Sequence, residues 1–199
     1  MATRSLWASY APTYRAAEMR CLASWVASGA SGSVVGLVGC GNIAESYARD
    51  LKTYAHIDLV GVTDMDAAKA RALATAFECQ QFASIDQLLA DPAIDLVVNL
   101  TTHHAHYAVI GQCLASGKHV YSEKPLSMTS EQAQHLVELA RSNGLRLGCS
   151  PFTYMGEAPQ TAWRLIREGR LGTVRVVYAE VNWGRIETWH PAPEAFYEV

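Results

Sequence analysis

The stretch GLVGCGNIAESYARDL, residues 36–51, decides how the rest of the sequence is interpreted. An apolar run ends in two glycines, and a segment whose apolar residues recur at helical spacing follows them. In a dinucleotide-binding turn, the first glycine permits a tight bend and the second lets the backbone approach a pyrophosphate. A third small residue lets helix and strand pack closely, and the helix N-terminus offers free N–H groups to the phosphates. We therefore expect the pyrophosphate of a dinucleotide to be contacted by Gly39, Gly41, Asn42, Ile43 and Ala44.

A phosphate loop of the ATPase type is an alternative for the same stretch, because Gly36 and Gly41 have the spacing of its two glycines. Such a loop next needs Lys-Ser or Lys-Thr, whose lysine reaches the phosphates and whose hydroxyl holds Mg²⁺. This chain has Asn42 and Ile43 there, so the loop lacks its main charge. Residues 14–41 nevertheless resemble the approach to a phosphate loop in some bacterial ATPases, which leaves an ATPase fragment as a third possible function.

Apolar runs and helical repeats alternate along residues 33–150. The runs predict strands over 33–39, 57–64, 94–100, 119–123 and 145–150, and the repeats predict helices over 43–51, 67–77, 84–90, 105–117 and 129–144. The strands lack polar alternation, which is typical of strands that are covered on both faces. We therefore expect an α/β fold in which helices doubly wind a parallel sheet, the Rossmann arrangement.

The pattern divides the chain into three segments. Residues 1–32 predict a short helix from about Thr13 and a flexible joint, and residues 33–150 predict the dinucleotide-binding domain. After that, a helix over 158–168 precedes a long strand over 172–184. Trp163 is expected to pack in the second domain, and Val176 and Tyr178 to lie in its core or at a sheet interface. Because a lone strand cannot bury its own face, we expect residues 151–199 to be an incomplete substrate and oligomerisation domain.

The composition is that of a soluble globular protein, with 50% hydrophobic and 18% charged residues. A net charge of −3 without a block of like charges argues against nucleic acid as a partner. No apolar stretch approaches the about 18 residues of a transmembrane helix, and charges interrupt the N-terminal region where a signal peptide would be apolar. Five scattered cysteines without a CxxC pair are typical of reduced thiols. We therefore expect a cytoplasmic protein with no membrane partner.

An acidic residue, Asp64, closes the second predicted strand. It follows the glycine turn by about 20 residues, which is the spacing of the dinucleotide fingerprint. A carboxylate there accepts hydrogen bonds from both ribose hydroxyls and repels the 2′-phosphate of NADP, and the neighbouring Met65 supplies no positive charge. The pattern therefore favours NAD as cofactor, with NADP left open.

Two later stretches identify a family. Residues 98–140 carry TT-x-x-x-H and then GKHV-x-x-EKP, and residues 166–184 carry EG-x-LG. In this order, they resemble the Gfo/Idh/MocA oxidoreductases, the group of glucose–fructose oxidoreductase and inositol dehydrogenase. The resemblance covers roughly residues 33–199. It implies a dinucleotide domain, a second domain on a large open sheet, and hydride transfer between NAD(P) and a sugar- or cyclitol-like substrate.

The resemblance also implies which residues line the cofactor. Beyond the glycine turn and Asp64, it adds Thr101, Thr102, His106, Glu123, Lys124 and Pro125. Thr102 stands where the family commonly has proline, so this turn is expected to differ. Pro125 is expected to fix the turn beside the nicotinamide.

Lys124 is the candidate catalytic residue. Oxidation of an alcohol needs a base for the hydroxyl proton and a positive group near the alkoxide, and a lysine whose pKa is lowered by burial serves both. A surface ion pair with Glu123 is the alternative. The family's usual acid/base, a histidine on a later helix, has no counterpart before Val199, and His190 is not a replacement. Two main functions therefore stay open: an NAD(P)-dependent dehydrogenase whose turnover is in doubt, and a non-catalytic dinucleotide-binding module.

Three other features of the sequence bear on metal binding, nucleophilic chemistry and assembly. His103, His104 and His106 cannot all face one ion at a strand-to-helix turn, so no metal site is predicted. Cys149 and Ser150 lack the turn that exposes a nucleophile and are expected to be buried and inert. The family commonly forms homo-oligomers through the sheet of the second domain, which makes oligomerisation doubtful for a chain with only the first strand of that sheet.

Overall fold

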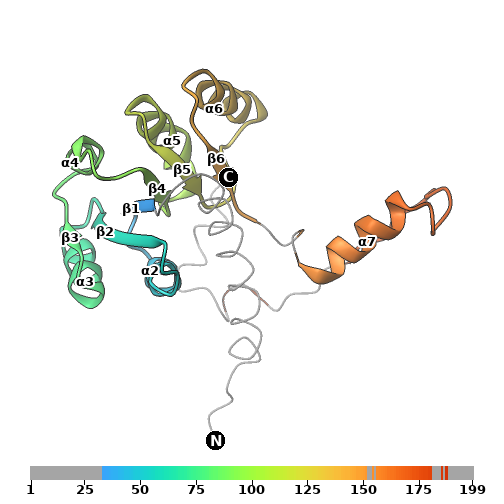
Figure 1. Cartoon of the computed structure of the whole chain (residues 1–199), viewed down its shortest axis with the longest axis horizontal. Helices are drawn as coiled ribbons and strands as arrows, with labels where there is room; N and C mark the ends of the chain where they lie inside the picture. The colour runs from blue at the N-terminus through green and yellow to red at the C-terminus, as the bar shows by residue number, and fades with distance from the viewer. Residues whose placement is uncertain (1–32, 152–153, 155, 181–184, 186, 188–199) are drawn as a thin grey trace, which may run out of the picture. The chain divides into compact units, whose positions relative to one another are not determined.

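The computed structural model describes residues 33–151, 154, 156–180, 185 and 187 (Figure 1). The chain forms two compact units, Met1–Gln160 and Thr161–Val199. The helix expected from Thr13 and the segment around His190 lie outside the described residues. Within the described part of the chain, no helix has the length and apolarity that crossing a bilayer requires.

Six strands form a parallel sheet in the described part of the first unit. They are β1 (Ser33–Val38), β2 (Ile57–Thr63), β3 (Gln80–Gln81), β4 (Leu96–Asn99), β5 (His119–Ser122) and β6 (Leu147–Cys149). Their spatial order is β3-β2-β1-β4-β5-β6, and every neighbouring pair is parallel. This is the strand order of the doubly wound dinucleotide-binding fold, so the predicted fold class is confirmed.

Helices cover both faces of the sheet. They are α2 (Ala44–Leu51), α3 (Ala67–Phe77), α4 (Ile85–Ala90), α5 (His106–Ala115) and α6 (Ser130–Ser142), with the 3₁₀ turn η1 (His103–Ala105) before α5. Figure 1 shows α2 and α3 on one side of the sheet and α5 and α6 on the other. Successive strand residues point to opposite faces: Val98 packs in the core with α2 and α3, and Val97 in the core with α5 and α6. Two apolar cores explain why the strands lack polar alternation.

The predicted helix boundaries rest on caps that the structure contains. The hydroxyls of Ser84 and Thr129 accept hydrogen bonds from the backbone N–H groups of Gln87 and Gln132, both at 3.3 Å. Gly117 and Gly144, which follow α5 and α6, have φ angles of +77° and +65°. These left-handed positions favour glycine and end the helices.

One strand of the sheet escaped the sequence prediction. β3 has two residues, which pair with Gly61 and Val62 of β2. A segment of two residues shows no periodicity, so its pairing is visible only once β2 is placed beside it. Each of the other strands is shorter than predicted by one to three residues. At β4, the apolar residues Ile94 and Leu100 are buried beside the strand without belonging to it, which is why the apolar run overestimated its length.

The segment after Pro151 departs from the prediction. Helix α7 (Glu157–Arg167) confirms the helix expected over 158–168 to within one residue. The strand expected over 172–184 is wrong for its described part, because residues 174–180 form no strand. Val176 and Tyr178 are 85% and 83% exposed and Trp163 is 57% exposed, so none of the three packs in a core of the described residues. A strand requires a neighbouring ladder, and none of the described strands pairs with this segment.

Candidate functional site

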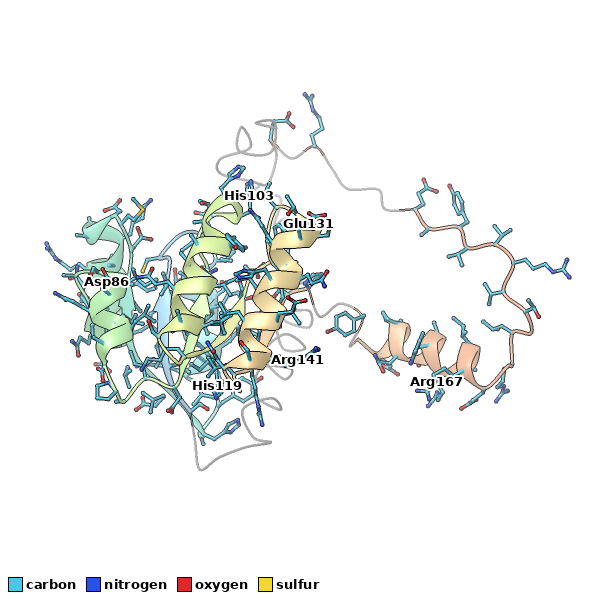
Figure 2. The ribbon with its side chains drawn as sticks, turned by 90° about the horizontal axis from the view of Figure 1, so that it is seen from above. Asp86, His103, His119, Glu131, Arg141 and Arg167 are labelled. Atoms are coloured by element: carbon cyan, nitrogen blue, oxygen red, sulfur yellow. The ribbon has the colours of Figure 1, made fainter. Side chains whose placement is uncertain are left out.

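Turns and loops from five strands meet at the carboxyl edge of the sheet. The residues that follow β1, β2, β4, β5 and β6 are Gly39, Asp64, Leu100, Glu123 and Ser150. The order of the strands reverses between β1 and β4, and open α/β sheets bind ligands in the crevice at such a point. Figure 2 shows His103, which follows β4, at the same end of the molecule as Glu131 and away from His119 and Arg141.

The two glycines of the turn after β1 have different roles. Gly39 has a φ of +96°, and a Cβ on it would lie 2.7 Å from the carbonyl carbon of Leu100 and from the nitrogen of Thr101. Gly41 is exposed, and a Cβ on it would meet no atom within 4 Å. Gly39 therefore permits the close packing of two turns, whereas the open space at Gly41 lets a ligand approach the backbone.

The N-terminus of α2 adjoins this open turn. Ala44 is fully buried, as close helix–strand packing requires, and its N–H donates to the carbonyl of Gly41 at 3.0 Å. Ile43, the N-cap residue, supplies no side-chain hydrogen bond to the helix. Ile43 is also 40% exposed and precedes α2, so it does not belong to the buried face of the predicted helix. An anionic group fits this uncapped helix end, where the dipole is positive.

Asp64 connects the glycine turn to the end of β2. Its Oδ2 accepts a hydrogen bond from the N–H of Cys40 at 2.6 Å, and its Oδ1 accepts one from the N–H of Asp66 at 2.7 Å. Each carboxylate oxygen has a second lone pair. Asp64 therefore orders the turn and keeps the capacity to accept hydrogen bonds from ribose hydroxyls.

Asn99, at the end of β4, organises the next loop and was missed by the sequence analysis. Its side chain is fully buried and donates from Nδ2 to Oγ of Ser122 at 3.0 Å. Its Oδ1 accepts from the hydroxyl of Thr101 at 2.7 Å and from the Thr101 N–H at 3.2 Å. Thr102 is exposed, with a φ of −70° that proline also adopts. The sequence feature that could have indicated Asn99 is a polar amide at the end of an otherwise apolar strand.

His106 has a different position from the one expected. The residue is 1% exposed, so its ring is buried below the open edge. Nδ1 lies 2.5 Å from the carbonyl oxygen of Pro125, and Nε2 lies 3.0 Å from that of Thr101. The ring packs between the loop after β4 and the loop after β5, and in either neutral tautomer its one N–H donates to one of the two carbonyls.

The Glu-Lys-Pro segment follows β5. Oε1 of Glu123 accepts a hydrogen bond from the hydroxyl of Tyr47 at 2.6 Å, and Oε2 accepts from the backbone N–H of Lys124 at 3.0 Å. The ion pair that was the alternative for Glu123 and Lys124 is not among the salt bridges of the described residues. Lys124 is exposed, so the burial that we expected for its side chain is absent. Pro125 is exposed as well.

Tyr47, Tyr121 and Ser150 form a buried hydroxyl cluster behind Glu123, and the sequence analysis did not assign it to the site. Ser150 Oγ lies 3.3 Å from the hydroxyl of Tyr47 and 3.1 Å from that of Tyr121. Burial, and then the Glu123 carboxylate, raise the pKa of Tyr47. A tyrosine among the apolar residues of α2 was the available signal, because a buried phenol usually needs a hydrogen-bond partner.

Burial keeps the cysteines near the site protonated. Burial, followed by the charge of Asp64, raises the pKa of Cys40 to about 12. Burial and the charge of Glu123 raise the pKa of Cys149 to about 11. A nucleophilic cysteine needs a lowered pKa, and Ser150 is itself 4% exposed. The raised pKa of Cys149 and the burial of Ser150 are therefore consistent with the inert role that we expected for both residues.

The histidine cluster does not converge on one point. The rings of His103 and His104 lie 4.0 Å apart between centroids, whereas His106 points to two carbonyl groups. Burial, and then the neighbouring His104, lower the pKa of His103. Over the described ranges, no group of three His, Cys, Asp or Glu side chains is placed to hold a metal ion.

Comparisons with known proteins extend this description. A family model described as an oxidoreductase family with an NAD-binding Rossmann fold matches residues 34–150. An inositol 2-dehydrogenase of Acidothermus cellulolyticus is 34% identical over 114 residues, which cover 56% of this chain and 33% of the relative. A 1,5-anhydro-D-fructose reductase of Ensifer adhaerens is 30% identical over 165 residues, which cover 80% of this chain and 50% of the relative.

A solved structure gives the same relation in three dimensions. The WlbA dehydrogenase of Bordetella pertussis, in complex with NADH and UDP-GlcNAcA, superimposes with a TM-score of 0.68 at 26% identity. The match covers 71% of this chain and 41% of that protein. The chain thus spans half or less of the length of the relatives that it matches. The segment that the family model matches contains every residue described at the carboxyl edge.

Proposed function

The chain belongs to the Gfo/Idh/MocA family of oxidoreductases, which have an NAD-binding Rossmann fold, and we propose that it transfers hydride between NAD(P) and a sugar- or cyclitol-like alcohol or ketone. One observation carries this proposal: the open turn at Gly41, the uncapped start of α2 and the carboxylate of Asp64 lie together at one edge of the sheet. The glycine pair that suggested an ATPase, Gly36 and Gly41, lies within the segment that the family model matches, which favours the dinucleotide turn over a phosphate loop.

The residues at the edge fit a nicotinamide dinucleotide. The open backbone at Gly41 and the first N–H groups of α2 would hold the pyrophosphate. The carboxylate of Asp64 would accept hydrogen bonds from the ribose hydroxyls of the adenosine half. A 2′-phosphate would meet the same carboxylate and be repelled, so we propose NAD as the preferred cofactor.

Lys124 is the residue that we propose to contact the substrate. When bound, the nicotinamide ring supplies the hydride acceptor or donor. The exposed side chain of Lys124 follows β5 at the carboxyl edge. As an ammonium group it stabilises a developing alkoxide, and as a neutral amine it accepts the proton of the substrate hydroxyl. The two forms serve reduction and oxidation respectively.

The proposed substrate class rests on relatives. An inositol 2-dehydrogenase and a 1,5-anhydro-D-fructose reductase act, by their names, on a cyclitol and on a sugar derivative. Both substrates carry a secondary alcohol or ketone on a six-membered ring, which is the group that hydride chemistry converts. We therefore propose this class of group for the present chain.

Binding and turnover test the proposal separately. NADH titrated into the protein is expected to show enhanced fluorescence that saturates, and excess ATP is expected not to displace it. NAD⁺ is then offered with a panel of sugars and cyclitols, and absorbance reports NADH. Lys124→Met is expected to bind NADH as the unchanged protein does and to lose turnover. A protein that binds ATP and not NADH contradicts the proposal.

A non-catalytic dinucleotide-binding module is the second candidate. The observation in its favour is that the open turn at Gly41, the start of α2 and Asp64 provide a dinucleotide site by themselves. Lys124, in contrast, is the one residue proposed for chemistry. The same assays separate the two functions. NADH binding without turnover of any substrate, across the pH range in which the protein stays folded, would favour the module over the dehydrogenase.

A further inference from the structure

A chain of three hydroxyl groups ends on the carboxylate of Glu123. Tyr121 of β5 lies 3.1 Å from Ser150, Ser150 lies 3.3 Å from Tyr47, and Tyr47 lies 2.6 Å from Oε1 of Glu123. The three hydroxyl-bearing residues are at most 4% exposed. They come from α2, from β5 and from the residue after β6, so the chain of bonds crosses the sheet edge.

The direction of each bond follows from counting protons. A carboxylate only accepts, so the single hydroxyl proton of Tyr47 is donated to Glu123. Tyr47 then has no proton left and accepts one from Ser150. Ser150 has likewise used its proton and accepts from Tyr121. All three hydroxyls therefore donate toward Glu123, and hydrogen bonds in such a series strengthen one another.

These bonds connect the two halves of the proposed cofactor site. Tyr47 lies on α2, the helix whose N-terminus adjoins the glycine turn. Glu123 precedes Lys124, whose backbone N–H donates to the other carboxylate oxygen, Oε2. The backbone N–H of Glu123 is in turn bound to the carbonyl of Asn99 at 2.9 Å. The phenol of Tyr47 therefore links the helix at the pyrophosphate side to the loop that carries Lys124.

We propose that Tyr47 is a positioning residue: through Glu123 it places the Lys124 loop for the nicotinamide half of the cofactor, relative to the α2 turn that holds the pyrophosphate. This inference rests on the proposed function. Tyr47 touches neither cofactor nor substrate in this proposal. Its effect is therefore specific to the half of the dinucleotide that the loop after β5 contacts.

Two ligands separate this role from a general loss of structure. NADH contains the nicotinamide ring, and ADP-ribose lacks this ring but keeps the ribose that carries it. Tyr47→Phe is expected to raise the Kd of NADH about tenfold, the scale of one hydrogen bond to a charged group, and to leave the Kd of ADP-ribose unchanged. Tyr121→Phe is the matched control, because it removes the same group two hydrogen bonds further from Glu123 and leaves Tyr47 bound to Glu123. Its expected effect on either ligand is below about twofold.

A double-variant cycle shows whether Tyr47 acts through Glu123. In the Glu123→Ala background, Tyr47→Phe is expected to cause no further change in the Kd of NADH. The inference is overturned if the effects of the two substitutions on the Kd of NADH are additive. It is also overturned if Tyr47→Phe weakens the binding of NADH and of ADP-ribose equally. If Tyr47→Phe does not fold, Glu123→Ala alone still decides, because a selective loss of NADH supports the linkage and an equal loss for both ligands overturns it. An unchanged protein that binds neither ligand instead contradicts the proposed function.

Discussion

Gly39 at the end of β1 packs directly on the backbone of Leu100 at the end of β4, where a Cβ on Gly39 would lie 2.7 Å from the carbonyl carbon of Leu100. The two residues directly follow β1 and β4, the two strands between which the order of the sheet reverses. Their contact sets how closely the turns on the two sides of the crevice approach. Glycine at position 39 is therefore required by packing as well as by its positive φ.

The first prediction concerns stability. Gly39→Ala is expected to lower the free energy of unfolding by about 2 kcal/mol or more, because the new Cβ meets backbone that cannot move aside and the φ of +96° strains alanine. Urea denaturation followed by circular dichroism measures the loss. An alanine variant as stable as the unchanged protein would show that the two turns are not packed in this way.

The second prediction uses the neighbouring glycine. Gly41→Ala is expected to change the free energy of unfolding by no more than about 1 kcal/mol, because its Cβ meets no atom within 4 Å. The same Cβ stands where the pyrophosphate would approach the backbone, so the Kd of NADH is expected to rise about tenfold or more. Unchanged NADH affinity in a folded variant would exclude this turn as the pyrophosphate site.

The third prediction concerns the choice between NADH and NADPH. Asp64→Asn keeps one acceptor oxygen and removes the charge, so it is expected to weaken NADH binding about tenfold and to narrow the preference for NADH over NADPH. Asp66→Asn is a matched control, since it removes the same charge two residues away and asparagine still caps α3. Both Kd values come from fluorescence titration. An equal change of preference in the two variants would refute the assignment of Asp64.

The fourth prediction tests the position found for His106. His106→Phe leaves the carbonyls of Thr101 and Pro125 without their ring partners, and it is expected to lower the free energy of unfolding by about 2–4 kcal/mol. His104 lies on the same turn but is exposed, so His104→Ala is expected to change the free energy of unfolding by no more than about 0.5 kcal/mol. Urea denaturation compares the two. Similar small losses in both variants would contradict the bridging role of His106.

The fifth prediction is a pH dependence. Burial raises the pKa of Cys113 from 9.0 to about 12, so this thiol stays protonated in the folded state and loses its proton on unfolding above pH 9. Its contribution to stability is complete below pH 9 and is lost as the pH rises toward 12. Free energies of unfolding are measured from pH 8 to pH 10.5. Over this range the free energy of unfolding of Cys113→Ala is expected to decrease less steeply with pH than that of the unchanged protein. Parallel curves for the two proteins would contradict the raised pKa.

The sequence was sufficient for the local features of the fold. Apolar runs and helical repeats predicted most of the strands and helices, because the periods of 2 and 3.6 residues are written along the chain. Ser84 and Thr129 predicted helix starts, because a cap acts within four residues. Gly39, Gly41 and Asp64 were found in the same way, since the turn and the strand end that use them have a fixed spacing.

The sequence did not reveal which distant groups meet. It placed His106 against the cofactor, whereas the ring is buried between two carbonyl groups. It predicted a strand over 172–184, and in the described part of that segment residues 174–180 form no strand and pair with no described strand. In both cases the outcome depends on a partner that is distant in the sequence, and a local residue pattern does not specify that partner.

Residue type and period by themselves therefore determined the α/β fold, the glycine turn and the acid that closes β2. Only the tertiary structure decided that Tyr47 bonds to Glu123 and that Asn99 holds Thr101 against Ser122. The physical reason is that periodicity and capping are short-range properties of one chain segment. A side-chain hydrogen bond between strands depends on which strands become neighbours, and that order exists only after the sheet has assembled.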